Sequence, residues 1–523
     1  MASKIQLRRD TASNWTSNGS VILSSGEPGF ETDTGYFKIG DGSTQWNDLA
    51  YIGAGTKANG AVAIGNNAGE TSQESESVAI GAYAGQCCQG YHAVAIGAAA
   101  GECCQGSWAV AIGRSAGSCC QGRHAVAIGH RAGDNCQGQC AVAIGAYAGA
   151  YCSQGSGAVA IGPYAGEYNQ RSESVAIGAY AGVCCQCYHA VAIGAAAGDF
   201  YQSSYGVAIG RAAGACCQGY EAIAIGRRAG EDCQGDRAIA IGAYAGAYCS
   251  QGSGAIAIGA YAGEYNQRSE SVAIGVCAGY ECQGYHAVAI GAAAGACCQS
   301  MWAIAIGRSA GNCCQGQGAV AIGRRAGNCC QGCEAIAIGT YAGQCCQGSG
   351  AIAIGSYTAK NCQQQNAIAI GNHAAETDVW LEIEWASGDG STNTIQITTN
   401  YDYAQIRVGM VLYNNGYDGQ VITAINGTTL TLDGVAPYGP VTGGTFQLAG
   451  RQGQNAIAIG AYAASKAQAP NSIVINATGS ELPSQGSGTT VIQSLRQVTG
   501  SVPSGFKSVY WNPTTGELIV VTP

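Results

Sequence analysis

The sequence predicts an all-β fold, a parallel β-solenoid built from short coils, and three observations lead to it. The string A-(V/I)-A-I-G, with minor variants, recurs 20 times between residues 61 and 371. Its glycine stands at 65, 81, 97 and 113 and continues at the same step, which is one longer at two places. Each copy alternates along the chain as a β-strand does. A unit of this length is too short for a helical hairpin and has no helical period. Two short strands and two turns account for one coil.

Composition supports a repetitive scaffold. The chain of 523 residues contains 83 glycines, and only 11% of its residues are charged, against roughly 25% in ordinary globular domains. Its net charge of −9 argues against a nucleic-acid partner, which selects basic surfaces. No apolar segment has the length of a secretory signal core or of a membrane span. We therefore expect synthesis in a cytoplasm and no membrane insertion.

A longer period lies on top of the short one. Gly81, Gly178 and Gly275 are each 97 residues apart, and the sequence between them is nearly copied. Six coils were evidently duplicated as a block. This kind of growth lengthens a scaffold and does not create a new active site.

The columns of the solenoid are assigned by counting from the glycine that ends each repeat. Valine or isoleucine stands three residues before it and isoleucine directly before it, so both are predicted to face the coil interior. The alanine between them is predicted to point outward, against another protomer. Cysteine, seven residues after the glycine in 15 repeats, is predicted to form a second interior column, as at Cys88, Cys104 and Cys120.

Glutamine occupies one position in every coil from Gln73 to Gln363. Such a column predicts stacked side-chain amides, each donating to the carbonyl of the next coil. This ladder would fix the register of strands that are otherwise flat and rich in alanine. Its role is structural, and its representative members are Gln89, Gln105, Gln121, Gln218 and Gln315.

The 28 cysteines leave three interpretations open. Interior cysteines pack well as reduced thiols, and synthesis in a cytoplasm favours that state. Outer cysteines of neighbouring coils lie within disulfide reach and are candidates for oxidation after cell lysis. A CC pair without a regular histidine partner is a weak zinc signal, and we predict neither a metal nor another cofactor.

Several aromatic residues share one corner of the coil and are candidates for receptor binding through stacking on sugars. The alternative is that they are incidental exposed aromatics without a binding role. They are Tyr91, Trp108, Tyr188, Tyr285 and Trp302. Acidic residues in the coils occur singly, and the six histidines form no catalytic arrangement. The sequence therefore predicts that the protein is not an enzyme.

Residues 376–450 differ sharply from the coils. They alternate apolar and polar residues and end in Gly/Asn turns, which predicts an inserted small β-barrel or sandwich. Trp380, Tyr401 and Tyr403 make it a candidate recognition module, and a spacer is an equal alternative. The β-roll is predicted to continue over 451–476 and to end in a C-terminal β tip at 477–523.

The repeat AVAIGxxAG, with SVAIG variants at 77–81, 174–178 and 271–275, resembles the head repeat of trimeric autotransporter adhesins. That resemblance implies a trimer of left-handed parallel β-rolls, here over residues 53–375, although the adhesin repeat is usually shorter. The adhesins' signal peptide and membrane anchor have no counterpart in this sequence.

Residues 5–52, with the core GEPGFETDTGYFKIGDG, are similar to the N-terminal domain of phage tail fibres and phage tropism determinants. Residues 471–480 and 508–521 are similar to C-terminal regions of viral fibre proteins. These resemblances imply that residues 1–52 form a β domain for trimerisation and attachment to a virion tail, baseplate or capsid protein.

The expectation is a phage-like tail or surface fibre, a homotrimer that projects from the virion and binds a host-surface glycan or protein. Its location would be the virion, outside the cell after release. A self-assembling extracellular filament is the alternative, and a glycan depolymerase is the less favoured third hypothesis.

Overall fold

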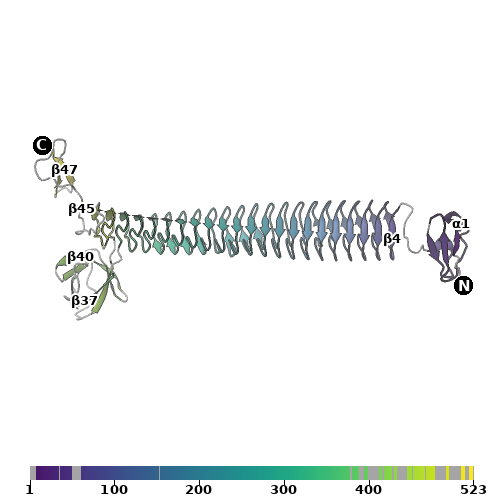
Figure 1. The fold of residues 1–523 in the computed structure, drawn as a ribbon, viewed down its shortest axis with the longest axis horizontal. Coiled ribbons are helices and arrows are strands. Elements are labelled where there is room, and N and C mark those ends of the chain that lie inside the picture. The colour runs from purple at the N-terminus through teal and green to yellow at the C-terminus, as the bar shows by residue number, and fades with distance from the viewer. Residues whose placement is uncertain are drawn as a thin grey trace, which may run out of the picture. The chain divides into compact units, whose positions relative to one another are not determined.

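The computed structural model describes residues 7–34, 36–49, 60–151, 153–376, 380–387, 394–397, 411–414, 417–426, 429–432, 444–449, 452–465, 467–476, 490–493, 508–512 and 517–521. The chain divides into two compact units, residues 1–313 and 314–523. The described parts are almost entirely β, with a parallel β-solenoid of about 22 turns (Figure 1). The predicted fold class is confirmed.

A small domain precedes the coils. Its elements are β1 (Arg8–Asp10), α1 (Ala12–Ser17), β2 (Pro28–Glu31), β3 (Phe37–Ile39) and the 3₁₀ helix η1 (Trp46–Asp48). β1 pairs with β2 in parallel, and β2 pairs with β3 antiparallel. Thr11 caps α1, because its hydroxyl accepts from the Asn14 amide at 3.2 Å. The rings of Trp15 and Trp46 stack at 4.0 Å and form the core with Leu23 and Leu49.

Each coil contributes a strand of three or four residues to a long parallel sheet. Equivalent residues of successive coils are paired, as Val110 is with Val126. In the first unit these strands are β4 (Val62–Ile64), β6 (Val78–Ile80), β8 (Val94–Ile96), β10 (Val110–Ile112), β12 (Val126–Ile128), β14 (Val142–Ile144), β16 (Val159–Ile161), β17 (Val175–Ile177), β18 (Val191–Ile193), β19 (Val207–Ile209), β21 (Ile223–Ile225), β23 (Ile239–Ile241), β25 (Ile256–Ile258), β26 (Val272–Ile274), β28 (Val288–Ile290) and β30 (Ile304–Ile306). In the second unit they are β32 (Val320–Ile322), β34 (Ile336–Ile338), β35 (Ile352–Ile354), β36 (Ile368–Ile370), β43 (Ile457–Ile459), β44 (Ile473–Asn476) and β45 (Thr490–Gln493).

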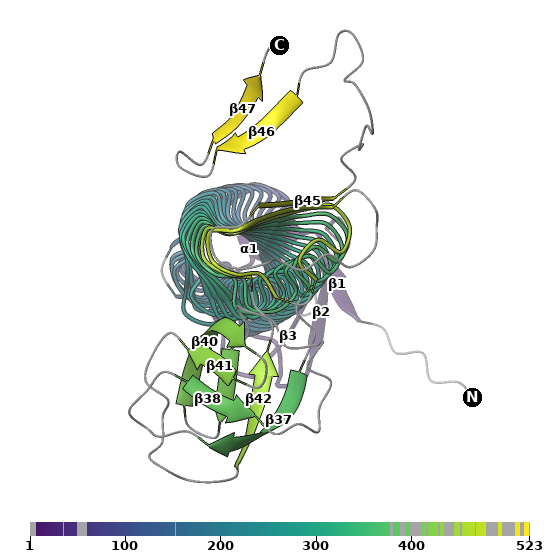
Figure 2. The ribbon, with the colours of Figure 1, turned by 90° about the vertical axis from the view of Figure 1, so that its left-hand side faces the viewer.

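The opposite wall of the coil carries strands of two or three residues that end at the recurrent glutamine position. Figure 2 looks along the stacked coils. They are β5 (Thr71–Gln73), β7 (Cys87–Gln89), β9 (Cys104–Gln105), β11 (Cys120–Gln121), β13 (Cys136–Gln137), β15 (Ser153–Gln154), β20 (Cys217–Gln218), β22 (Cys233–Gln234), β24 (Ser250–Gln251), β27 (Cys282–Gln283), β29 (Cys298–Gln299), β31 (Cys314–Gln315) and β33 (Cys330–Gln331). These strands also pair in parallel and in register, as Gln121 does with Gln137.

The predicted orientation of the long sheet is wrong. In β10 the central Ala111 is fully buried, whereas Val110 and Ile112 are half-exposed, and this pattern recurs along the sheet. The interior is narrow, because the wall opposite presents glutamine side chains and a further buried alanine such as Ala116. Only a methyl group fits there. The larger apolar side chains therefore point out, and each coil has two columns of half-exposed valine or isoleucine.

The predicted interior column of cysteines is also wrong. Cys88, Cys104 and Cys120 are exposed, because the next residue in each coil, the glutamine, points inward and successive residues of a strand face opposite sides. An open groove of about 380 Å³ runs beside this column, lined by Cys104, Gln105, Gly106, Cys120, Gln121, Gly122, Cys136, Gln137, Gly138, Ser153 and Gln154.

Six strands of residues 380–449 form a closed antiparallel barrel, in the order β37 (Trp380–Ser387), β38 (Thr394–Ile397), β41 (Thr429–Leu432), β40 (Tyr417–Asn426), β39 (Val411–Asn414) and β42 (Gly444–Ala449). The coils on either side of this segment are direct neighbours, since Ile368 of β36 pairs with Ile457 of β43. The barrel is thus inserted between two successive coils. Near the C-terminus, β46 (Ser508–Asn512) and β47 (Glu517–Val521) pair antiparallel.

Candidate functional site

The aromatic corner predicted from the sequence lies at the turn between the short strand and the next long strand. All five described residues are exposed, with exposed fractions from 43% for Tyr91 to 53% for Trp302. The exposed fractions of Trp108, Tyr188 and Tyr285 lie between these two values. Of the candidates in the inserted domain, Trp380 begins β37, and Tyr401 and Tyr403 lie outside the described residues.

Neighbouring rings cover each other's faces at this corner. Trp108 stacks on His92 with a centroid distance of 4.1 Å, and His92 also meets the edge of Tyr91. The His92 Nδ1 lies 3.1 Å from a carboxylate oxygen of Glu76 in the preceding coil. The same pair recurs at His189–Glu173 and His286–Glu270. The corner therefore offers ring edges and polar atoms to a ligand, more than free ring faces for stacking on a sugar.

The glutamine column forms a hydrogen-bonded ladder inside the coils. Gln89 Nε2 donates to the Gln105 Oε1 of the next coil at 3.2 Å, and also to the Val78 carbonyl at 2.7 Å on the opposite wall. Corresponding amide bonds link Gln105 to Gln121, Gln218 to Gln234 and Gln315 to Gln331. These amides thus join neighbouring coils, and the Gln89 amide also joins the two walls of the solenoid.

The two coils with one extra residue interrupt this ladder. Gln154 Oε1 and Gln251 Oε1 are buried and have no hydrogen-bond partner, although the amide of each still donates onward, to Gln170 and to Gln267. The extra residue precedes both glutamines in the sequence. One rung is thus absent at each of these coils, while the stacking on the C-terminal side is intact. Gln89 Oε1 is also buried without a partner, although its coil has no extra residue.

A second corner, just after the long strand, was missed by the sequence analysis. In several consecutive coils, the second residue after the glycine of the repeat is tyrosine. The rings of these tyrosines stack face to face from one coil to the next. Tyr147 and Tyr164 lie 5.1 Å apart at an interplanar angle of 4°, and Tyr180 follows at 5.0 Å. A parallel column holds Tyr151 and Tyr168 at 5.3 Å. The available signal was the motif GxYAG, which recurs at the step of the coil repeat.

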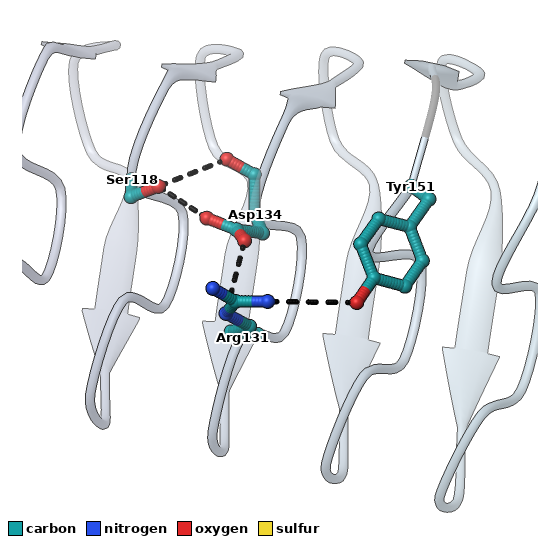
Figure 3. A network of polar contacts seen from close by, with 4 residues as sticks. All are labelled: Ser118, Arg131, Asp134 and Tyr151. Atoms are coloured by element: carbon teal, nitrogen blue, oxygen red, sulfur yellow. Dashed lines mark hydrogen bonds and ion pairs between the residues drawn. The ribbon is translucent and has the colours of Figure 1, made fainter.

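Arginine stands at the N-terminal end of this tyrosine stack. Figure 3 shows the polar contacts of Arg131 with Asp134 and Tyr151. The Arg131 guanidinium lies 6.0 Å from the ring centroid of Tyr147, 3.6 Å from the Asp134 carboxylate and donates to the Tyr151 hydroxyl at 3.5 Å. The hydrogen bond to Tyr151 and the charge of Asp134 raise the pKa of Arg131. Ser118 of the preceding coil donates to Asp134.

The same network recurs 97 residues later. Arg228 lies 3.4 Å from the Glu231 carboxylate and donates to the Tyr248 hydroxyl at 3.2 Å. The pKa of Glu231 is raised, because the effect of burial is larger than the opposite effect of the Arg228 charge. Tyr244 and Tyr261 repeat the stack at 5.2 Å. The second copy therefore preserves both the aromatic column and its cation.

Within the described ranges, no group of three or more His, Cys, Asp or Glu side chains is placed to hold a metal ion. The cysteines of these ranges are free thiols. The described helices are also too short and too polar to cross a bilayer.

The N-terminal domain is similar to known phage proteins. Residues 5–44 match the family of the Major tropism determinant N-terminal domain. Proteins named hyaluronoglucosaminidase from Streptococcus pyogenes phages H10403 and H4489A are each 45% identical over 49 residues, which is 9% of this chain and 14% and 13% of those proteins. The match thus spans about a seventh of those relatives. No solved structure matches the chain. Together these findings show that the N-terminal segment is similar to the tropism-determinant domain and to the matching segment of phage proteins, and they support a phage tail-fibre-like protein.

Proposed function

We propose that the protein is a homotrimeric tail fibre that attaches a phage to its host. The observation that carries the proposal is the match of residues 5–44 to the tropism-determinant domain, joined to a long shaft of closely similar coils. In this arrangement residues 1–52 bind a tail, baseplate or capsid protein, and the shaft and the inserted barrel face the host. Repetition on three chains and several fibres turns weak contacts into firm attachment.

The outward valine and isoleucine columns support the trimer. They expose apolar side chains on every coil, with Ile64 at 47% and Ile209 at 36% exposure. A continuous apolar surface of this length is typical of an interface. Its partner must present apolar groups at the same coil spacing over the same length. A second and a third copy of this chain meet that requirement, and the surface is then buried around a threefold axis.

The trimer is tested by the solution mass of the purified protein, measured by light scattering with and without reductant. Three chains in both conditions is the expected result. Replacing Ile128 and Ile144 with lysine should lower the mass to one chain, because two charges per protomer would be buried in the interface. Lysine at the exposed Gln139 and Ser156 is the matched control. A wild-type mass of one chain would sink the proposal, and a polydisperse larger mass would favour the filament.

Attachment is tested with the same protein. The soluble fibre should block adsorption of virions that carry this chain to the bacterium in which they propagate. A variant without residues 1–52 should block equally well but fail to enter virions. No blocking by the full chain at saturating concentration would contradict the attachment function.

We further propose that attachment does not require glycan cleavage. The relatives named hyaluronoglucosaminidase share only the N-terminal segment, and the proposed binding surfaces lie outside it. Incubation of the protein with hyaluronan should release no reducing ends. A release that grows with time and protein concentration would replace this proposal with the depolymerase hypothesis.

A further inference from the structure

Positive charge is concentrated on one corner of the solenoid. Between residues 60 and 376 the chain has twelve arginines and one lysine, and eight of the arginines occupy the first or second position after the glycine of a repeat. They are Arg114, Arg131, Arg211, Arg227, Arg228, Arg308, Arg324 and Arg325. This is the corner that carries the tyrosine stacks. In a chain with a net charge of −9, such clustering sets the corner apart electrostatically.

Five of these arginines belong to three clusters, each at the N-terminal end of a tyrosine stack. We define them as cluster 1 (His130, Arg131, Tyr147), cluster 2 (Arg227, Arg228, Tyr244) and cluster 3 (Arg324, Arg325, Tyr341). Each is 97 residues from the next in the sequence. Each tyrosine is followed by a stacked aromatic ring, at 5.1 Å, 5.2 Å and 5.0 Å respectively.

The guanidinium groups lie over the tyrosine rings. In cluster 2, Arg227 and Arg228 are 4.7 Å and 5.8 Å from the Tyr244 centroid. In cluster 3, Arg324 and Arg325 are 4.8 Å and 5.7 Å from the Tyr341 centroid. Contact with the ring holds each planar group in place. An arginine held in this way loses less conformational entropy when it binds an anion.

The clusters differ in how far nearby carboxylates neutralise them. Arg131 and Arg228 pair with Asp134 and Glu231. Arg227, Arg324 and Arg325 are exposed, and none of the ion pairs between described residues includes them. At the sequence position of Asp134 and Glu231, cluster 3 has Asn328. Cluster 3 thus keeps two arginines while the acidic neighbour is lost, which indicates an anion-binding role beyond packing on the ring.

We propose that the three clusters bind an anionic carbohydrate polymer of the host surface, an inference that rests on the proposed attachment function. A guanidinium fork matches a carboxylate or phosphate group through two parallel hydrogen bonds. The neighbouring tyrosine hydroxyls and ring edges suit sugar hydroxyl and C–H groups. Each cluster therefore recognises one acidic group together with the sugar units around it.

The spacing of the clusters favours a polymer with sparse charges over a nucleic acid. Clusters 1 and 2 are six coils apart, about 29 Å at the usual strand spacing. A nucleic acid carries a phosphate on every nucleotide and is best held by a continuous basic track. A glycan with an occasional acidic group needs a cation only at each cluster.

The test measures binding of the full chain to carboxymethyl dextran of low substitution, by surface plasmon resonance at fixed ionic strength. Uncharged dextran and oligothymidine of similar length are the comparison probes. The cluster variant carries Arg227→Gln, Arg228→Gln, Arg324→Gln and Arg325→Gln. The control carries Arg123→Gln, Arg171→Gln, Arg237→Gln and Arg268→Gln, which removes the same charge elsewhere, including beside the first aromatic corner.

The cluster variant should bind carboxymethyl dextran at least tenfold more weakly, and the control should change by less than twofold. Equal losses in both variants would mean general electrostatics and would overturn the inference. So would equal binding of uncharged dextran, or tighter binding of oligothymidine. If the fourfold variant does not fold, Arg227→Gln and Arg324→Gln alone give the same comparison, because neither residue has an ion pair within the described ranges.

The adsorption assay separates this inference from the attachment function. If the wild-type fibre blocks adsorption and the cluster variant retains full binding to carboxymethyl dextran, the inference fails and attachment stands. If the wild-type fibre does not block adsorption, attachment fails, and with it the assignment of the polymer to a host surface.

Discussion

In the N-terminal domain, the core consists of large side chains: Trp15, Leu23 and Trp46 are buried, and the two indoles stack. In the solenoid coils, the core consists of alanine methyl groups and glutamine amides, and the large apolar side chains are turned outward. The two regions are therefore sensitive to opposite changes. Removing atoms should damage the domain, whereas adding atoms should damage the coil.

The largest effect is expected where an added atom meets backbone. Gly97 has a φ of +129°, and a Cβ there would lie 2.6 Å from the Gly113 carbonyl oxygen of the next coil. Gly97→Val would introduce both backbone strain and overpacking. Together these should lower the free energy of unfolding by about 5 kcal/mol. Thermal unfolding followed by circular dichroism should show a strongly lowered Tm of the solenoid. An unchanged Tm would mean that the coils tolerate wider spacing.

Trimming the N-terminal core is the converse test. Trp46→Ala removes a buried ring that stacks on Trp15 at 4.0 Å and whose centroid lies 5.0 Å from the Lys38 ammonium. We expect a loss of about 4 kcal/mol in that domain. Near-ultraviolet circular dichroism of the tryptophans would report it. A lower Tm of the coils, with an unchanged Tm of the domain, would contradict the view that the domain is the region sensitive to lost atoms.

Breaking the glutamine ladder should have a smaller effect. Gln218→Leu keeps a similar volume but deprives the Val207 carbonyl and the Gln202 amide of this partner. Unsatisfied buried groups cost about 2 kcal/mol, so the Tm should fall while the solution mass stays unchanged. Gln139→Leu on the exposed turn is the control. Equal Tm values for both variants would show that the ladder does not stabilise the coil.

A buried carboxyl group should make coil stability depend on pH. Glu264 is 3% exposed, and burial raises its pKa above the ordinary 4.5. The folded coil therefore binds the proton more tightly than the unfolded chain, and stability should fall as the pH rises from about 4.5 through the folded-state pKa. Glu264→Gln should flatten that part of the profile of Tm against pH, and Glu281→Gln on the exposed surface should not. A steeper profile in Glu264→Gln would contradict the assignment.

Substitution in the exposed cysteine column should have the smallest effect on stability. Cys120 is exposed, and Gln121 beside it is buried. Cys120→Ser should change the free energy of unfolding by less than about 0.5 kcal/mol, as surface substitutions usually do. Thiol reagents should also label the native protein at Cys120 without prior unfolding. Protection from labelling until the Tm is reached would restore the interior assignment.

The sequence by itself determined the repeat, the all-β solenoid and the stacked glutamines, because these follow from a constant step between repeats and from one amide at a constant position. It also indicated the aromatic corner of Tyr91 and Trp108, whose exposure the structure confirms. The Arg–Tyr corner was visible in the sequence as well, but its meaning depended on knowing that the first and second residues after the glycine share one turn.

Tertiary structure alone decided which face of each strand is inside. Alternation places Ala111 opposite to Val110 and Ile112, but it does not say which side is the interior. The usual preference for burying larger apolar groups gave the wrong answer, because the distance between the two coil walls admits only a methyl group beside the glutamine amides. The same width turns Cys120 outward. The physical reason is steric: the interior space depends on both walls together, and no single strand specifies it.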